Sequence, residues 1–223
     1  MKAVLFDFGG TLDSDGRAWG DRFYPLYKEA ALPSLPRKLF DEAFYRCDDE
    51  LALRFPLAGL SFKQTLELQV GCMLERIAPS RLALKTVISQ RFLDDCRKSF
   101  ERNRPLLARL KSRYRLGIVS NFYGNLQSVL ASEDLAGYFD AVADSGVVGR
   151  VKPDREIFLH AARALGLTPA DCLMVGDSVP RDMKGAEGLG MRHALLAPNP
   201  LARPCCPEAW RLGCLAELEG RLL

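Results

Sequence analysis

The chain has 223 residues, which at about 150 residues per domain is enough for one or two domains with a sizeable core. Hydrophobic residues make up 48% and charged residues 26%, ordinary values for a soluble globular protein, so disordered, fibrous and collagen-like classes are excluded. The net charge of +3 is spread along the chain without a long basic block, so the sequence predicts no nucleic-acid partner.

The sequence also predicts no membrane partner. No apolar run approaches the roughly 18 residues of a membrane-spanning helix, and the first apolar stretch ends at Asp7. The seven cysteines are scattered and odd in number, and none form a C-x-x-C pair, which argues against a disulfide framework or a zinc site. We therefore expect a cytoplasmic protein with reduced thiols, and we assign no role to Cys205 and Cys206.

The first half of the chain changes from strand to helix. Residues 2–8 are apolar and run into Gly9-Gly10, which predicts a buried strand that ends in a tight loop. Residues 13–101 carry apolar side chains at three- and four-residue spacing, which is typical of helices. Ser61 and Gln64 have the spacing of a capping box at the start of one of them. Aromatic residues near the start of this block either shape a specificity pocket or form its core: Trp19, Phe23, Tyr24 and Tyr27.

After residue 101, strand and helix patterns alternate. Strands are expected at 115–119, 139–143, 172–175 and 193–196, and helices at 124–131, 154–165 and 180–187. A loop containing Pro198, Pro200, Pro204 and Pro207 precedes a last short strand and helix. This alternation predicts an α/β fold, a parallel sheet covered by helices on both faces. We expect a core of residues 1–12 and 102–223, interrupted by an all-helical cap of residues 13–101.

Polar residues follow the predicted strands directly. Ligands of open parallel sheets bind beyond the carboxyl ends of the strands, so these side chains are candidates for one site. They are Asp7 and Thr11 after the first strand, Ser120 and Asn121 after the second, Lys152 in a later loop, and Gly176, Asp177 and Asp182 after the strand at 172–175.

This set of side chains suits phosphoryl chemistry. Several carboxylates would repel a phosphate dianion unless a divalent cation lay between them, and Asp7, Asp177 and Asp182 offer the oxygen ligands that Mg²⁺ prefers. One carboxylate can then attack phosphorus and form an aspartyl-phosphate. Lys152 would neutralise charge on the transferring group, and Ser120 would donate a hydrogen bond to it.

Four segments in this order resemble the motifs of the haloacid dehalogenase superfamily. They are Phe6-Asp7-Phe8-Gly9-Gly10-Thr11-Leu12, Val119-Ser120-Asn121, Val151-Lys152-Pro153-Asp154, and Val175-Gly176-Asp177-Ser178 with Asp182, and the resemblance covers the whole chain. It implies a Rossmann-like core with an α-helical cap inserted after the first motif. It also implies Asp7 as nucleophile, the backbone carbonyl of Gly9 and the carboxylate of Asp177 as Mg²⁺ ligands, and Asp182 as a ligand or a partner of one.

The substrate side of the site follows from the same resemblance. Lys152 is expected to act in catalysis and to bind phosphate together with Ser120. Thr11 and Asn121 are further candidates for substrate binding, although Thr11 could instead satisfy loop backbone and Asn121 could be structural. The expected activity is Mg²⁺-dependent hydrolysis of a small phosphorylated metabolite.

Gly9 departs from the family pattern. The superfamily's phosphatases usually carry a second aspartate there as general acid and base, and losing such a group costs about 10²- to 10⁴-fold in rate. Asp13, Asp15 or a carboxylate from the cap could substitute, or the enzyme could be slow and need an acidic leaving group. Two other readings stay open: a phosphate-ligand sensor or scaffold without turnover, and a metal-free hydrolytic 2-haloacid dehalogenase.

Overall fold

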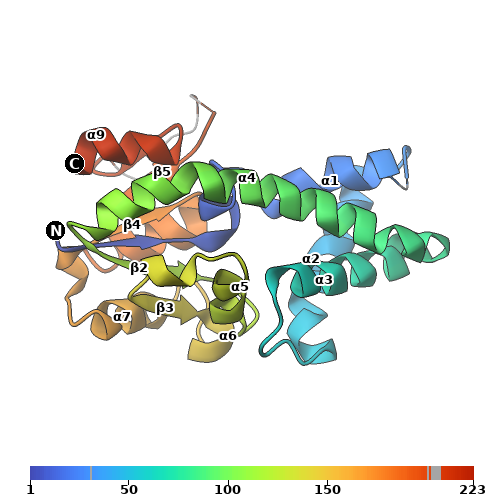
Figure 1. Cartoon of the computed structure of the whole chain (residues 1–223), viewed down its shortest axis with the longest axis horizontal. Helices are drawn as coiled ribbons and strands as arrows, with labels where there is room; N and C mark the ends of the chain where they lie inside the picture. Colours follow the sequence, from blue (N-terminus) through green and yellow to red (C-terminus); the bar gives the residue numbers. More distant parts are fainter. Residues whose placement is uncertain (31, 200, 202–206) are drawn as a thin grey trace.

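The computed structural model describes residues 1–30, 32–199, 201 and 207–223. In this part of the chain, six strands form one parallel sheet in the order β3-β2-β1-β4-β5-β6 (Figure 1). The strands are β1 Ala3–Phe6, β2 Arg115–Ser120, β3 Ala141–Asp144, β4 Cys172–Gly176, β5 Arg192–Leu196 and β6 Trp210–Leu212. The predicted α/β fold with a parallel sheet is therefore confirmed.

Alternate residues of β1 pack into separate apolar clusters on the two faces of the sheet. Val4 and Phe6 belong to one cluster together with α4, α5 and α9, and Ala3 and Leu5 belong to the other together with α7 and α8. These helices are α4 Lys85–Lys111, α5 Leu126–Ser132, α7 Arg155–Ala164, α8 Lys184–Glu187 and α9 Glu219–Leu222. The sheet is thus covered by helices on both faces, as predicted.

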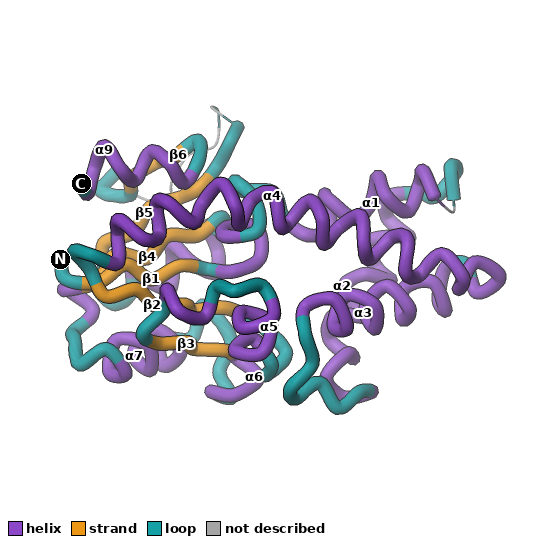
Figure 2. The backbone as a smooth tube through the Cα atoms, in the orientation of Figure 1, coloured by secondary structure: helices purple, strands orange, loops and turns teal. Residues whose placement is uncertain are grey.

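The insert between β1 and β2 is helical. Its helices are α1 Trp19–Ala30, α2 Arg37–Arg54, α3 Phe62–Ile77 and the first part of α4. The predicted capping box of α3 is present, since Ser61 Oγ accepts a hydrogen bond from the Gln64 N–H at 3.3 Å and Gln64 Oε1 accepts one from the Ser61 N–H at 2.9 Å. Helix α4 then leads from the cap back onto the sheet (Figure 2). The predicted cap boundary at 101/102 falls inside α4 and stays a prediction.

Aromatic side chains join the cap to the sheet. Phe8, which follows β1, packs against Phe62 of α3, Phe100 of α4 and Phe122 after β2, with ring centroids 5.6 to 5.9 Å apart. Burial of each such side chain contributes about 1.5–3 kcal/mol, so the contact is a substantial part of the hydrophobic core. Cap and sheet therefore share one continuous apolar cluster.

Several local details differ from the sequence expectations. The predicted helix at 180–187 is a π-helical turn, Val179–Met183, followed by α8, and a short helix α6, Ser145–Val148, was not anticipated. Short 3-10 segments lie at Pro79–Leu84, Ala136–Tyr138, Pro169–Asp171 and Leu215–Leu218. The last predicted strand and helix correspond to β6 and α9.

Some predictions concern residues outside the described part of the chain. These are Pro200 and Pro204 of the proline-containing loop, and Cys205 and Cys206. The cysteines that are described are free: Cys47, Cys72, Cys96 and Cys172 are buried and Cys214 is half-buried. Among the helices in the described ranges, none is both long and apolar enough to cross a membrane.

Candidate active site

Parallel pairing in register brings the polar ends of three strands together. Phe6 of β1 pairs with Ile118 of β2 on one side and with Val175 of β4 on the other. The residues that follow, Asp7 and Asp177, together with Ser120 at the end of β2, therefore emerge at the same edge of the sheet. The loop before α7 adds Lys152 to this edge.

The Asp7 carboxylate is held by three donors. Its Oδ1 accepts hydrogen bonds from Ser120 Oγ at 2.7 Å and from the Phe8 N–H at 2.7 Å, and the Lys152 ammonium lies 2.8 Å away. Every bond found to this carboxylate within the described ranges ends on Oδ1. Oδ2 therefore stays available to a reacting group or an ion.

Lys152 joins two carboxylates. Its Nζ lies 2.8 Å from Asp7 Oδ1 and 2.6 Å from Asp182 Oδ1, and all three residues are buried. Burial alone would lower the pKa of Lys152, but the charges of Asp182 and Asp7 outweigh it, so the pKa lies above the ordinary value. The lysine thus remains a cation at neutral pH.

The side chain of Asn121 positions the segment that carries this lysine. Asn121 Oδ1 accepts from the Lys152 N–H at 2.7 Å, and its Nδ2 donates to the Lys152 carbonyl at 3.3 Å. The structure thus shows Asn121 in a structural contact, while it also lines the pocket described below. Its role in substrate binding stays a prediction.

Three carboxylates converge beside this lysine. Asp7, Asp177 and Asp182 each present an oxygen within 4.8 Å of the others. Burial, followed by the charges of Asp7 and Asp182, raises the pKa of Asp177 to about 8. The cluster therefore carries more negative charge than Lys152 balances.

Two glycines permit this close approach. Gly10 has φ +83°, and a Cβ there would lie 2.5 Å from Asp177 Oδ2. A Cβ at Gly176 would lie 2.4 Å from Cγ of Asp182. Any larger residue at either position would displace one of the two carboxylates.

The donor set fits a magnesium ion. Mg²⁺ prefers oxygen ligands and takes few of them from the protein, and carboxylate oxygens from Asp7 and Asp177 are within reach of one ion. Both oxygens of Asp182 already accept, one from Lys152 and the other from the Ser178 N–H at 2.9 Å, which favours a supporting role for Asp182. The carbonyl of Gly9 as a ligand stays a prediction.

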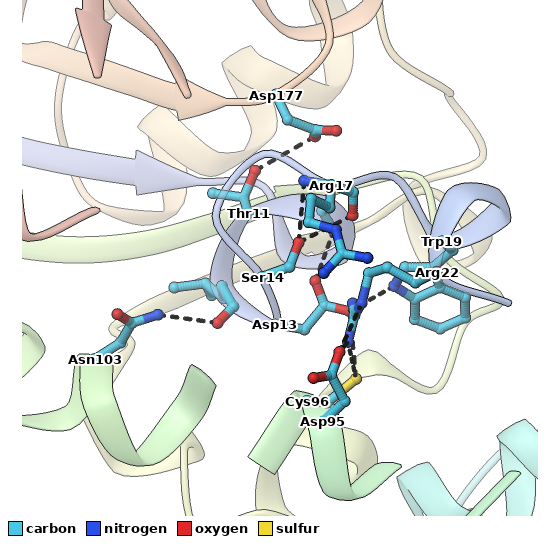
Figure 3. Close-up of polar contacts among 12 residues, drawn as sticks. Thr11, Asp13, Ser14, Arg17, Trp19, Arg22, Asp95, Cys96, Asn103 and Asp177 are labelled. Atoms are coloured by element: carbon cyan, nitrogen blue, oxygen red, sulfur yellow. Dashed lines mark hydrogen bonds and ion pairs between the residues drawn. The ribbon is translucent and has the colours of Figure 1, made fainter. Parts of the chain in front are cut away.

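Thr11 is a predicted substrate-binding residue that contacts the acidic cluster. It is fully buried, and its hydroxyl donates to Asp177 Oδ1 at 3.4 Å (Figure 3). It does not line the pocket formed by the described residues. Substrate binding by Thr11 stays a prediction, and the contact that the structure shows is with the Asp177 carboxylate.

A pocket of about 720 Å³, counting its open mouth, lies over these groups between cap and sheet. Its floor contains Asp7, Gly9, Ser120, Asn121, Phe122, Tyr123, Lys152, Asp177 and Arg181, and its cap side contains Ala18, Trp19, Gly20, Phe44, Tyr45 and Asp48. Trp19 is thus a pocket residue, whereas Phe23 and Tyr27 are core, and both alternatives for this aromatic group hold in part.

Sequence reasoning missed the three polar pocket residues Asp48, Tyr123 and Arg181. Asp48 did leave a signal in the sequence. It lies four residues after Phe44 and three before Leu51, both buried, so it interrupts the apolar face of α2 with a charge. An acidic residue in such a position needs a reason.

Asp13 is the hinge carboxylate nearest to Gly9 in the sequence, and it is fully engaged. It accepts hydrogen bonds from the Gly10 N–H at 2.6 Å, from Trp19 Nε1 at 2.6 Å, from Arg22 Nη1 at 2.7 Å and from Cys96 Sγ at 3.6 Å (Figure 3). Its side chain has no exposed surface. These contacts argue against Asp13 as the substitute for an aspartate at position 9.

Asp15 and the space beside Gly9 lead to the same conclusion. Asp15 pairs with Arg102 at 2.6 Å and accepts from the Leu215 N–H at 3.2 Å, and neither partner lines the pocket. A Cβ at Gly9 would lie 3.1 Å from Trp19 Nε1. The indole of Trp19 therefore crowds the space into which a side chain at position 9 would extend.

A comparison with protein families identifies the chain. The model of haloacid dehalogenase-like hydrolases matches residues 1–190, which include all four motif segments. The chain belongs to the haloacid dehalogenase-like hydrolases. Membership agrees with the observed fold, in which a helical insert separates β1 from β2 of a parallel α/β sheet.

Relatives within this family have several names. The chain is 40% identical to the haloacid dehalogenase-like hydrolase domain-containing protein 3 of Bos taurus over 92 residues, 41% of this chain and 37% of that protein. It is 29% identical to the glyceraldehyde 3-phosphate phosphatase of Methanothermobacter thermautotrophicus over 204 residues, 88% of this chain and 85% of that one. The chain thus spans well under half the length of the bovine relative.

A solved structure of a dehalogenase with an intermediate complex shares the fold. Its TM-score is 0.66 at 19% identity, with 100% of this chain and 97% of that chain covered. Similarity at this identity concerns the fold and leaves the chemistry to the residues of the site.

Proposed function

We propose that this haloacid dehalogenase-like hydrolase is a Mg²⁺-dependent phosphohydrolase that acts on a small phosphorylated metabolite through an aspartyl-phosphate at Asp7. One observation carries the proposal: a buried lysine contacts the candidate nucleophile Asp7 at 2.8 Å and the acidic cluster, through Asp182, at 2.6 Å. Phosphoryl transfer needs this combination of a positioned nucleophile and nearby positive charge.

The residues have distinct roles in the proposed reaction. Asp7 Oδ2 forms a bond to phosphorus, and the bond from phosphorus to the leaving oxygen breaks with its electron pair on that oxygen. Ser120 and the Phe8 N–H hold the Asp7 carboxylate through Oδ1, so that Oδ2 faces the substrate. Lys152 balances charge on the transferring group, as expected from its ammonium contact. Water then cleaves the aspartyl-phosphate and releases phosphate.

Magnesium, when bound, supplies the positive charge that allows a phosphate dianion to approach the carboxylates. Asp7 and Asp177 would hold it, with the Gly9 carbonyl as a further ligand and Asp182 as a ligand or as support through Lys152. The raised pKa of Asp177 supports a cation there, because a nearby positive charge would relieve the repulsion among the carboxylates.

The surroundings of the pocket support a small organic substrate. Five aromatic side chains line it, from Trp19, Phe44, Tyr45, Phe122 and Tyr123, and they suit a metabolite with an organic leaving group. The free buried thiols described above favour the reducing environment of the cytoplasm, which is where we place the activity.

Gly9 favours a second candidate, a phosphate-ligand sensor or scaffold that has lost turnover together with the second aspartate. Dehalogenation of 2-haloacids, the third candidate, needs no metal and gives no reason for the acidic cluster of Asp7, Asp177 and Asp182. The acidic cluster favours the phosphohydrolase over dehalogenation, and a measurement of turnover separates the phosphohydrolase from the sensor.

The test is hydrolysis of p-nitrophenyl phosphate and a panel of small phosphate monoesters by the full chain, with and without Mg²⁺. Asp7→Asn should reduce turnover by about 10⁴-fold or more, as expected for loss of a nucleophile. Asp94→Asn, an exposed carboxylate of α4, is the control and should behave as wild type.

Four results would decide against the proposal. Turnover by Asp7→Asn, or turnover independent of Mg²⁺, would contradict the mechanism. Tight phosphate binding without turnover would support the sensor. Release of chloride from a 2-haloacid without metal would support the dehalogenase.

A further inference from the structure

The pocket contains one carboxylate without a role in the proposed reaction. Among the described residues that line it, three carry carboxylates: Asp7, Asp177 and Asp48. Asp7 is the candidate nucleophile, and Asp177 belongs to the acidic cluster and accepts from Thr11. Asp48 alone comes from the cap, on α2.

In-line geometry defines where a proton donor must lie. The attacking and leaving oxygens of a transferring phosphoryl group are roughly opposite each other. With attack by Asp7 from the sheet edge, the leaving oxygen would lie on the far side of phosphorus, and the cap residues line the pocket opposite the sheet edge. Water that later cleaves the aspartyl-phosphate attacks from that same side, so one group there can serve both steps.

Asp48 lines the cap side of the pocket. Phe44 and Leu51, its neighbours on the same face of α2, are buried, and the Asp48 side chain is half-buried between cap and sheet. The Tyr123 hydroxyl, from the loop after β2, donates a hydrogen bond to Asp48 Oδ1 and fixes the carboxyl at the pocket. Burial raises the pKa of Asp48 against the opposing effects of Tyr123 and Arg181, which favours the protonated form that a donor needs.

We propose that Asp48 is the general acid and base of this enzyme and replaces the aspartate that the family usually has at position 9. This inference rests on the proposed phosphohydrolase function. The Asp48 carboxyl gives its proton to the leaving oxygen as the phosphorus–oxygen bond breaks, which yields the free alcohol and the Asp48 carboxylate. That carboxylate then takes a proton from the water that attacks the aspartyl-phosphate, and Asp7 is released as a carboxylate together with inorganic phosphate.

The other candidates for this role are occupied or lie outside the pocket. Asp13 accepts from four donors, Asp15 lies beside Arg102 away from the pocket, and Trp19 crowds position 9. A purely structural role for Asp48, as a hydrogen-bonded tie to Tyr123 between cap and sheet, is the reading that the experiment must separate from catalysis.

The experiment compares two substrates of similar shape whose leaving groups differ in basicity. In p-nitrophenyl phosphate the leaving phenolate is weakly basic and needs little protonation, whereas in phenyl phosphate it is more basic. For Asp48→Asn, kcat/KM should fall about 10²-fold or more with phenyl phosphate and less than about tenfold with p-nitrophenyl phosphate. Because kcat/KM reports only the steps up to the first irreversible one, this difference isolates proton donation.

A rapid-mixing experiment tests the second step. Asp48→Asn should show a burst of p-nitrophenol equal to the enzyme concentration, since the aspartyl-phosphate forms but water is not activated. Tyr123→Phe keeps the carboxyl and removes the tie, so it should retain the wild-type dependence on leaving group. Glu42→Gln, an exposed carboxyl on α2, is the matched control and should match wild type with both substrates.

Equal losses with both substrates, no burst, or the same profile for Tyr123→Phe and Asp48→Asn would overturn the assignment and indicate a structural tie. These outcomes are separate from failure of the proposed function itself. If Asp7→Asn abolishes turnover while Asp48→Asn shows no leaving-group effect, only the role of Asp48 is wrong. If Asp7→Asn remains active, the phosphohydrolase mechanism is wrong.

Discussion

Asp7 and Asp13 lie six residues apart in the sequence but belong to two clusters of opposite electrostatic character. At the sheet edge, Asp7, Asp177 and Asp182 share the single ammonium of Lys152 and lie at or beside a pocket. The other cluster, around Asp13, does not line the pocket.

In this hinge cluster, Asp13 has four donors, and Arg22 contacts Asp95 and Cys96 as well as Asp13 (Figure 3). Arg22 also lies over the ring of Phe92, 4.4 Å from its centroid. Its guanidinium balances the charge of Asp13, and the half-exposed Asp95 remains in contact with water.

The difference between the clusters separates function from stability. Unbalanced negative charge at the first cluster favours binding of a cation, whereas balanced charge at the second ties the hinge to the cap. Removing the single cation of each cluster should therefore affect different properties.

The largest expected effect is on the rate. Lys152→Met removes the cation that contacts Asp7, and Mg²⁺-dependent turnover of p-nitrophenyl phosphate should fall about 10³- to 10⁵-fold, as for other single cations at a transferring phosphoryl group. Lys184→Met, an exposed lysine of α8, is the control and should keep wild-type kcat/KM. A loss of less than tenfold in Lys152→Met would show that the lysine serves the fold rather than the reaction.

The next effect is on stability. Arg22→Met leaves Asp13 buried without its cation, and the free energy of unfolding should fall by about 3–5 kcal/mol. Urea unfolding, followed by circular dichroism, measures this loss. Arg37→Met removes two exposed ion pairs, with Asp21 and Asp41, and should cost less than about 1 kcal/mol. If both variants lose equal stability, the hinge cluster is no more important than a surface pair.

The smallest effect concerns pH in the absence of metal. The pKa of Asp177 is raised from 3.8 to about 8, so between these values the unfolded chain releases a proton that the folded protein keeps. In EDTA, the free energy of unfolding should therefore decrease as pH rises through this window, and Asp177→Asn should flatten the decrease.

Bound Mg²⁺ should raise the free energy of unfolding and so offset this pH-dependent decrease. Saturation to 100 times the dissociation constant would add about 2.7 kcal/mol of stability, which Asp177→Asn should reduce. Urea unfolding between pH 5 and pH 8, inside the window from 3.8 to about 8, measures both the pH dependence and the effect of Mg²⁺. Parallel curves for the wild type and Asp177→Asn would show that the acidic cluster does not control the dependence.

Much of the site could be predicted because its chemistry lies at the ends of strands. Asp7, Ser120 and Asp177 each follow a short apolar strand, and parallel pairing leaves such residues no place but one edge of the sheet. Lys152 was predicted from its motif, and the structure adds its bridge from Asp7 to Asp182. The periodicity of residues 13–101 likewise predicted the helical insert between β1 and β2.

Other features depend on contacts between segments that are distant in the sequence. From sequence alone, Asp13 and Asp15 are equal candidates to replace the aspartate missing at position 9. The structure pairs Asp13 with Arg22, and Asp15 with Arg102, which lies far away in the sequence. The sequence marks Asp48 as a charge on the apolar face of α2, but its contact with Tyr123, 75 residues away, depends on the packing of α2 against the loop after β2.

The sequence by itself determined the alternation of strands and helices, the family and the residues at the strand ends, because each depends on local pattern and on the direction of parallel strands. The tertiary structure alone decided which carboxylates are neutralised by arginine and which face the pocket. Charge balance and burial depend on where the cap helices pack against the sheet, and no local pattern encodes that placement.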